Sequence, residues 1–144
     1  MYIPAEIGPL EPAPKLQQKI YTTHAGGKDV TQLPNLLVGL EAILIDIRFA
    51  PPVQPIKWSR DYLKALLKKK YLHVPTLGDR ADAERRLSGK SSIHNLGLGI
   101  KIITELRINL VLFCSCENEL TCHRRAISKE LNKQGREVSD LLDW

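Results

Sequence analysis

The chain lacks the features that would place it in a membrane or in the common nucleotide-binding classes. No apolar run approaches the ~20 residues of a membrane-spanning helix, and residues 1–14 lack the basic start and apolar core of a signal peptide. There is no P-loop, no G-x-G-x-x-G fingerprint and no H-E-x-x-H pair. We therefore expect a cytoplasmic protein with no membrane partner, outside the P-loop and zinc-protease classes.

Cysteine is also scarce, since the chain has only Cys114, Cys116 and Cys122, all in one stretch. Clustered cysteines in an intracellular protein indicate thiol chemistry or a metal site rather than a disulfide framework. Together with His123 they would form a C-x-C-x5-C-H set of zinc ligands. However, Cys122 and His123 are neighbours that point in different directions, and the set lacks two separated ligand pairs. We expect neither a metal nor a cofactor.

What the sequence does contain is typical of one globular domain with a basic surface. The 144 residues, 43% of them hydrophobic and 26% charged, are enough for a single core. The formal net charge of +5 suits a phosphorylated or nucleic-acid partner without requiring one. Much of the excess comes from residues 68–70 and 85–86, which also fit solvated helix ends.

Strand-like and helix-like segments alternate along the chain. Four prolines predict an extended arm over residues 1–18, followed by one domain over residues 19–144. Strand patterns cover about 19–24, 42–48, 71–74, 108–114 and 137–139, and helical patterns cover about 30–39, 60–70, 81–87, 93–106 and 122–135. This order predicts a three-layer Rossmann-like α/β fold, with a mainly parallel sheet of about five strands and helices on both faces.

Polar residues recur at the predicted carboxyl ends of the strands, where ligands bind in sheets of this kind. Along the chain these residues are Thr23 and His24, Asp46 and Arg48, His73, Cys114 and Cys116, and then Cys122, His123 and Arg124 at the start of the last helix. Recurrence at four strand ends predicts a single shared site.

Four of these residues have side chains suited to catalysis. His24 and His123 are candidates for general acid or base, and Asp46 is a candidate to orient one of them. Cys122 is the candidate nucleophile, because the dipole at the start of a helix and neighbouring cations favour its thiolate.

Three others are candidates to bind an anion. Arg48 and Arg124 carry guanidinium groups that can hold a phosphate or a carboxylate, and Thr23 adds a hydroxyl. The exposed N–H groups at the start of the last helix would help to bind the same anion.

Each candidate also has a structural interpretation, and the sequence leaves both open. His24 and His73 could be loop or strand histidines with local partners. Asp46 and Arg48 stand two residues apart, so in a strand they point to the same face and could form an ion pair that anchors the proline loop. Cys114 could be a buried thiol of the core.

Four short motifs in this order resemble the family called domain of unknown function 488. They are residues 20–22 with His24, residues 46–48 with Pro51, residues 71–78, and Cys114 followed by residues 122–124. The resemblance covers about residue 19 to the C-terminus. It implies an α/β fold with one shared site, in which Cys114 and Cys122 match the family's two cysteines, and it implies no particular reaction. This chain has Ala25 where the family usually has serine, and Cys116 where it often has an acidic residue.

The sequence thus favours a hydrolase or transferase that acts on a phosphorylated or nucleotide-like molecule, which could be part of a nucleic acid. One alternative is a non-catalytic nucleic-acid or nucleotide-binding module that uses the same basic residues. The other is a thiol redox protein built on Cys114 and Cys122.

Overall fold

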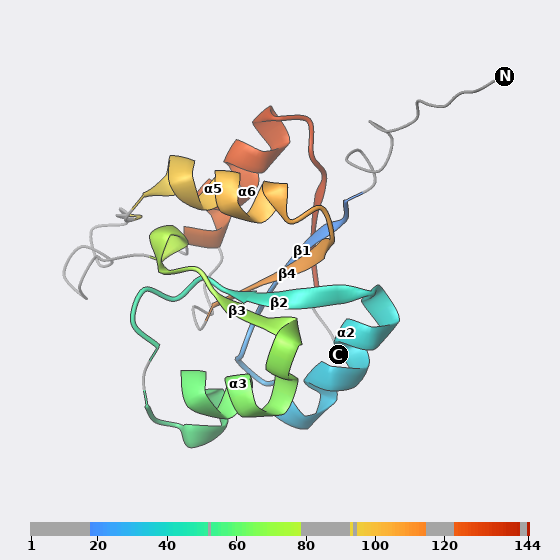
Figure 1. The fold of residues 1–144 in the computed structure, drawn as a ribbon, viewed down its shortest axis with the longest axis vertical. Coiled ribbons are helices and arrows are strands. Elements are labelled where there is room, and N and C mark those ends of the chain that lie inside the picture. Colours follow the sequence, from blue (N-terminus) through green and yellow to red (C-terminus); the bar gives the residue numbers. More distant parts are fainter. Residues whose placement is uncertain (1–17, 52, 79–92, 94, 115–122, 142–143) are drawn as a thin grey trace, which may run out of the picture.

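The computed structural model describes residues 18–51, 53–78, 93, 95–114, 123–141 and 144. At its centre is a five-stranded sheet with the strand order β3-β2-β4-β1-β5, in which every pair is parallel (Figure 1). The strands are β1 (Ile20–His24), β2 (Ala42–Asp46), β3 (Tyr71–His73), β4 (Asn109–Cys114) and β5 (Val138–Asp140). The predicted parallel α/β sheet of about five strands is confirmed.

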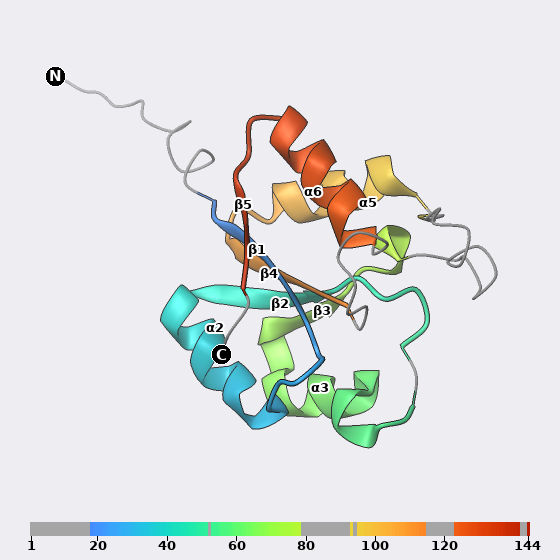
Figure 2. The same cartoon turned by 180° about the vertical axis from the view of Figure 1, so that it is seen from behind.

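Helices connect the consecutive strands. They are α2 (Leu33–Leu40), α3 (Arg60–Leu67), α5 (Leu96–Glu105) and α6 (His123–Lys133), with 3-10 turns η2 (Val30–Gln32), η3 (Ile56–Trp58), η4 (Lys68–Lys70) and η5 (Pro75–Leu77). In both views α2 and α3 lie on one side of the sheet, and α5 and α6 on the other (Figure 1, Figure 2). Within the described residues, no helix has the length and apolar character needed to cross a membrane.

The central strand β4 shows why the sequence produces two cores. Leu110, Leu112 and Cys114 pack with residues of α5 and α6, whereas Val111 and Phe113 pack with residues of α2 and α3. All five side chains have an exposed fraction of 0%. A strand covered on both faces has no solvent side, which explains its unbroken apolar sequence.

The helix ends carry residues that are typical of helix caps. The Ser59 hydroxyl accepts a hydrogen bond from the N–H of Tyr62 at the start of α3. Pro34 lies in the first turn of α2, where its missing N–H costs nothing. Gly135 adopts a positive φ of 83° just after α6. The predicted helix over residues 81–87, and residues 1–17 of the predicted arm, lie outside the described residues.

The helices that follow β1 and β4 in the chain lie on opposite faces of the sheet. β1 leads to α2, while its neighbour β4 is followed in the chain by α6, on the other face (Figure 1). Ligands in open parallel sheets bind at such a topological switch point, beyond the carboxyl ends of the two strands. The residues at that point are His24 and Cys114, which are paired in register.

Candidate functional site

His24 ends β1 at the topological switch point. Its Nδ1 accepts a hydrogen bond of 3.1 Å from the backbone N–H of Gly26. A ring nitrogen that accepts a hydrogen bond carries no proton, so in this geometry the imidazole is neutral and protonated at Nε2. The ring therefore has its acceptor nitrogen bonded within its own loop.

His123 is the first residue of α6 and is 4% exposed. Its Nε2 lies 3.0 Å from the carbonyl oxygen of Ile47. Because a carbonyl oxygen only accepts, Nε2 is the donor in this bond. The bond ties the start of α6 to the end of β2, and it fixes where the helix begins relative to the switch point.

Arg124 is buried beside the carboxylate of Asp140, with an exposed fraction of 2%. One guanidinium nitrogen, NH1, donates to Oδ1 of Asp140 at 3.4 Å, and the Thr22 hydroxyl donates to the same oxygen at 2.8 Å. The Asp140 side chain remains 28% exposed. This ion pair joins α6 to the edge strand β5 and to β1.

Arg124 and Asp140 line a pocket of about 290 Å³ between α6 and the β1–β5 edge, which we call the α6 pocket. Its other lining residues are Thr22, Arg125, Ser128, Lys129, Asn132 and Val138. Three of the eight lining residues are cations and one is a carboxylate. The pocket therefore has a positive electrostatic potential.

The exposed cations of the α6 pocket lie on one face of the helix. Arg125 and Lys129 are four residues apart and both are exposed. Ser128 and Asn132 add neutral hydrogen-bond donors from the same stretch of α6. Cations and neutral donors around one hollow form a site that can hold a phosphate group.

Asp46 and Arg48 form a buried ion pair on the opposite face of the sheet. Arg48 donates from Nε to Oδ1 of Asp46 at 2.8 Å and from NH2 to Oδ2 at 2.7 Å, and its NH1 donates to the carbonyl oxygen of Trp58 at 2.7 Å. The exposed fractions are 0% for Asp46 and 5% for Arg48. Each of the three guanidinium nitrogens thus has a partner within the fold.

Tyr71 completes this pair. Its hydroxyl donates to Oδ2 of Asp46 at 2.6 Å. Burial, and then the negative charge of Asp46, raise the pKa of Tyr71 far above its usual range, so the hydroxyl stays protonated. The Arg48 guanidinium also lies over the ring of Phe113, 5.0 Å from the centroid. This arrangement braces β2 against β3 and β4.

The predicted site residues therefore fall on two faces of the sheet. His24 continues the face of Ile20 and Thr22, which packs toward α5 and α6. Asp46 and Arg48 contact Tyr71 and Trp58 in the other core. His73 belongs with this second group, because its Nε2 lies 2.7 Å from the carbonyl oxygen of Arg48.

Thr23 and the cysteines complete the predicted set. Thr23 is fully buried; its hydroxyl accepts from Nε1 of Trp144 at 2.8 Å and lies 3.3 Å from the carbonyl oxygen of Leu141. Cys114 has an exposed fraction of 0% and is part of the core. Cys116 and Cys122 lie outside the described residues. Within the described part of the chain, no group of His, Cys, Asp and Glu could hold a metal ion.

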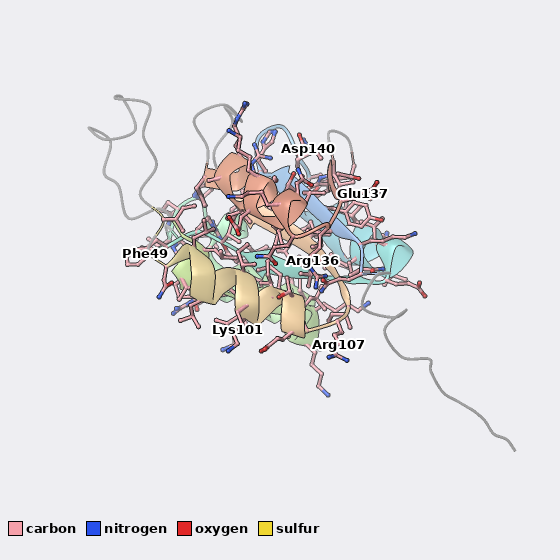
Figure 3. The ribbon with its side chains drawn as sticks, turned by 90° about the horizontal axis from the view of Figure 1, so that it is seen from above. Phe49, Lys101, Arg107, Arg136, Glu137 and Asp140 are labelled. Atoms are coloured by element: carbon pink, nitrogen blue, oxygen red, sulfur yellow. The ribbon has the colours of Figure 1, made fainter. Side chains whose placement is uncertain are left out.

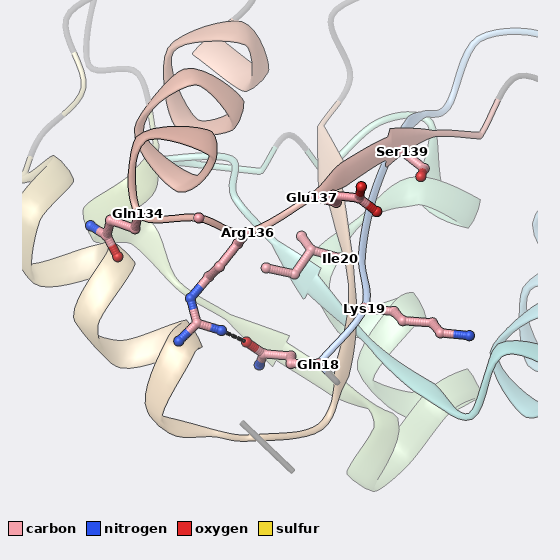
Figure 4. A pocket seen from close by; sticks show the side chains of 8 residues that line it. Gln18, Lys19, Ile20, Gln134, Arg136, Glu137 and Ser139 are labelled. Atoms are coloured by element: carbon pink, nitrogen blue, oxygen red, sulfur yellow. Dashed lines mark hydrogen bonds between the residues drawn. The ribbon is translucent and has the colours of Figure 1, made fainter. Parts of the chain in front are cut away.

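Another hollow, of about 360 Å³, lies at the amino ends of the strands (Figure 4). There Arg136 donates to Oε1 of Gln18 at 2.7 Å. The amide nitrogen of Gln18 lies 3.2 Å and 2.9 Å from the carbonyl oxygens of Ile103 and Ile108. Since the polar groups of Gln18 bond to the fold itself, we assign this hollow a structural role. Gln18, which the sequence placed in the arm, is buried here.

Sequence reasoning missed most of the α6 pocket. It selected Arg124 but not Arg125, Lys129 or Asp140. The spacing of Arg125 and Lys129 was a usable signal, because residues four apart share a helix face. The part played by Asp140 depends on β5 pairing with β1, which no local pattern reports.

No family model, curated protein or solved structure matches the chain in the comparisons made. The resemblance to domain of unknown function 488 therefore stays a prediction from the four motifs. The α/β class follows from the sheet itself.

Proposed function

We propose that the protein binds a phosphorylated or nucleotide-like ligand at the carboxyl edge of the sheet, with the anionic group in the α6 pocket. The observation that carries this proposal is the lining of that pocket, where three cations face one carboxylate. Arg125 and Lys129 are exposed. A ligand phosphate would gain their charge at the solvent-exposed surface.

Asp140 gives the α6 pocket a second property. It holds the buried Arg124 in place, but its own negative charge opposes an incoming anion. A ligand with a single phosphate and neutral groups that donate to Asp140 would satisfy both charges. Ribose or sugar hydroxyls provide such donors, which favours a phosphorylated sugar or a nucleotide over inorganic phosphate.

A second candidate function is catalysis, as a hydrolase or transferase, and it rests on the position of His24. Thr22 lines the α6 pocket, and His24 lies two residues further on the same strand face, roughly 7 Å along β1. A phosphate ester bound in the pocket could therefore reach His24. To protonate the leaving-group oxygen as a general acid, His24 would give up the bond from Gly26 and take a second proton, because only the imidazolium is acidic enough.

The thiol redox alternative has less support among the described residues. Cys114 is fully buried among apolar side chains. Reactive thiols are accessible and lie near cations, whereas burial in apolar surroundings disfavours the thiolate. We therefore do not place Cys114 in the proposed function, and Cys122 remains the nucleophile predicted from the sequence.

The experiment that separates binding from catalysis is the substitution His24→Gln. Nucleoside monophosphates and sugar phosphates would first be screened for binding by calorimetry, and the binders then assayed for release of phosphate or transfer to an acceptor. If His24 is the general acid, His24→Gln keeps the dissociation constant and lowers turnover about 100-fold or more. Wild-type binding without any turnover would leave the non-catalytic module as the function.

If the ligand is a nucleic acid, the affinity should depend strongly on the salt concentration. A protein that contacts several phosphates loses affinity steeply as salt rises, because each contact releases counterions. A mononucleotide with one phosphate in the α6 pocket should lose far less. Comparing a nucleoside monophosphate with a 20-nucleotide single strand at two salt concentrations distinguishes the two ligands.

A further inference from the structure

A separate groove of about 770 Å³ lies between the loop after β2 and the start of α3, and we call it the α3 groove. Its walls include Phe49, Val53, Ile56, Arg60, Asp61 and Tyr62. Figure 3 shows Phe49 on a different side of the molecule from Asp140 of the α6 pocket (Figure 3). The groove is therefore a second site, and its function does not depend on the one proposed above.

Four large apolar side chains in the walls of the α3 groove are exposed to solvent. The exposed fractions are 76% for Val53, 60% for Ile56, 39% for Phe49 and 37% for Tyr62. Single exposed apolar residues are common on protein surfaces, but several around one hollow mark a site of interaction. The groove therefore offers a place for an apolar side chain of a partner.

The segment that forms the α3 groove carries an excess of cations, while the lining of the groove itself holds one cation, Arg60, and one carboxylate, Asp61. Residues 49–72 contain six basic residues and one acidic residue. The basic residues are Lys57, Arg60, Lys64, Lys68, Lys69 and Lys70, all of them exposed. Arg60 and Lys64 are four residues apart on α3, so they extend the positive surface from the groove along the helix. The surface therefore complements an acidic partner.

The α3 groove is held in shape by the buried core beneath it. Trp58, between the two walls, is 6% exposed and stacks on Phe113 with ring centroids 5.3 Å apart. At the start of the loop, a Cβ atom at Gly78 would overlap the backbone of Phe49, so only glycine permits this close approach. A preformed groove loses little conformational entropy on binding.

We infer that the α3 groove docks an acidic peptide segment of a partner protein, with one bulky apolar side chain as its anchor. A membrane surface fits less well, because the apolar residues line a hollow rather than a protruding tip. Single-stranded nucleic acid fits less well too, because the two most exposed apolar residues of the groove, Val53 and Ile56, are aliphatic and cannot stack on bases, whereas its aromatic residues are less exposed.

The test is a selection from a random peptide display library on the immobilised full-length chain. The expected result is enrichment of peptides with several Asp or Glu residues around Leu, Ile or Phe. The best selected peptide, labelled with fluorescein, is then titrated by fluorescence anisotropy. Ile56→Asp should weaken its binding about tenfold or more, since it places a carboxylate in the anchor position.

Two further variants make the test specific. Arg60→Glu with Lys64→Glu should weaken the same peptide at low salt and should have a smaller effect at high salt. Val38→Asp is the matched control, because Val38 is 61% exposed on α2, away from the groove, and its substitution should leave affinity unchanged. The inference is overturned if no acidic consensus is selected, if Ile56→Asp binds as well as wild type, or if these variants instead abolish binding to a 20-nucleotide single strand or to phosphatidylserine vesicles.

Discussion

Arg48 and Arg124 are both buried and both lie beside an aspartate, yet they stand in different surroundings. The Arg48 guanidinium makes a two-point contact with Asp46 at 2.7 and 2.8 Å, and its remaining nitrogen bonds to the carbonyl oxygen of Trp58. Arg124 approaches the partly exposed Asp140 at 3.4 Å and lines a pocket. The first arginine is enclosed in a core, and the second, although only 2% exposed, lines the pocket in which we propose that a ligand binds.

This contrast shows that position at a strand end does not by itself identify a ligand-binding arginine. Arg48 follows β2 and Arg124 opens α6, so both sit where parallel sheets bind ligands. What separates them is the set of partners supplied from elsewhere in the fold. The Asp-x-Arg motif forms a brace here because Tyr71 and Trp58 surround it.

The largest expected effect comes from breaking the brace with Asp46→Asn. The substitution keeps the shape of the side chain but leaves the buried Arg48 charge without its counter-ion. We expect a loss of about 3–5 kcal/mol in the free energy of unfolding, measured by urea denaturation. If Asp46→Asn costs under ~1 kcal/mol, the pair is not the brace that its geometry describes.

Tyr71→Phe removes another part of the same brace, and we expect it to lower the free energy of unfolding by less than Asp46→Asn does. Removing the hydroxyl that donates to Asp46 should cost about 1.5–3 kcal/mol, because the acceptor is charged and buried.

Alkaline pH provides an independent readout of Tyr71. Its pKa is raised in the folded state, so its contribution to stability is complete below pH about 10 and declines as the pH rises above that ordinary tyrosine pKa. Absorbance titration at alkaline pH should show a tyrosine fraction that resists ionisation until the protein unfolds. In Tyr71→Phe that resistant fraction should be missing. A wild-type protein with no such resistant fraction would contradict the assignment.

Asp140→Asn is the matched substitution on the other face and should have the smallest effect on stability. Asp140 is 28% exposed, so solvent screens its attraction for Arg124, and we expect a loss of roughly 1 kcal/mol or less. Because the change removes the only carboxylate among the described lining residues, it should also raise affinity for phosphate. Weaker phosphate binding in Asp140→Asn would mean that Asp140 is needed to hold Arg124 in its binding position.

Sequence patterns predicted the sheet because its strands are unusually apolar. The apolar run of β4 is buried on both faces, and Ser59 and Pro34, residue types typical of helix starts, lie at the starts of α3 and α2. Strand composition and cap residues are local signals, so they can be read without the fold. The observed strands and helices differ from the predicted ones mainly in their ends.

The site was less predictable because its partners come from distant parts of the chain. The Thr22–Asp140 hydrogen bond joins residues 118 apart, and the Tyr71–Asp46 bond joins residues 25 apart. Both depend on the strand order, in which β5 lies beside β1 and β3 lies beside β2. Sequence patterns selected Asp46, Arg48 and Arg124 as candidate site residues. They did not show that all three guanidinium nitrogens of Arg48 bond to groups of the fold.

We propose that the α6 pocket, and not the chain's overall positive charge, binds a phosphorylated ligand. The direct test is a calorimetric titration of a nucleoside monophosphate into the wild type and two double variants. Arg125→Ala with Lys129→Ala removes the two exposed cations of the pocket, and Lys69→Ala with Lys101→Ala removes two exposed cations elsewhere.

Both double variants change the net charge by the same amount, so long-range attraction falls equally in each. We predict that the pocket variant weakens the dissociation constant about tenfold or more and that the control variant stays within about twofold of wild type. Equal weakening in the two variants, or no binding by the wild type, would contradict the account.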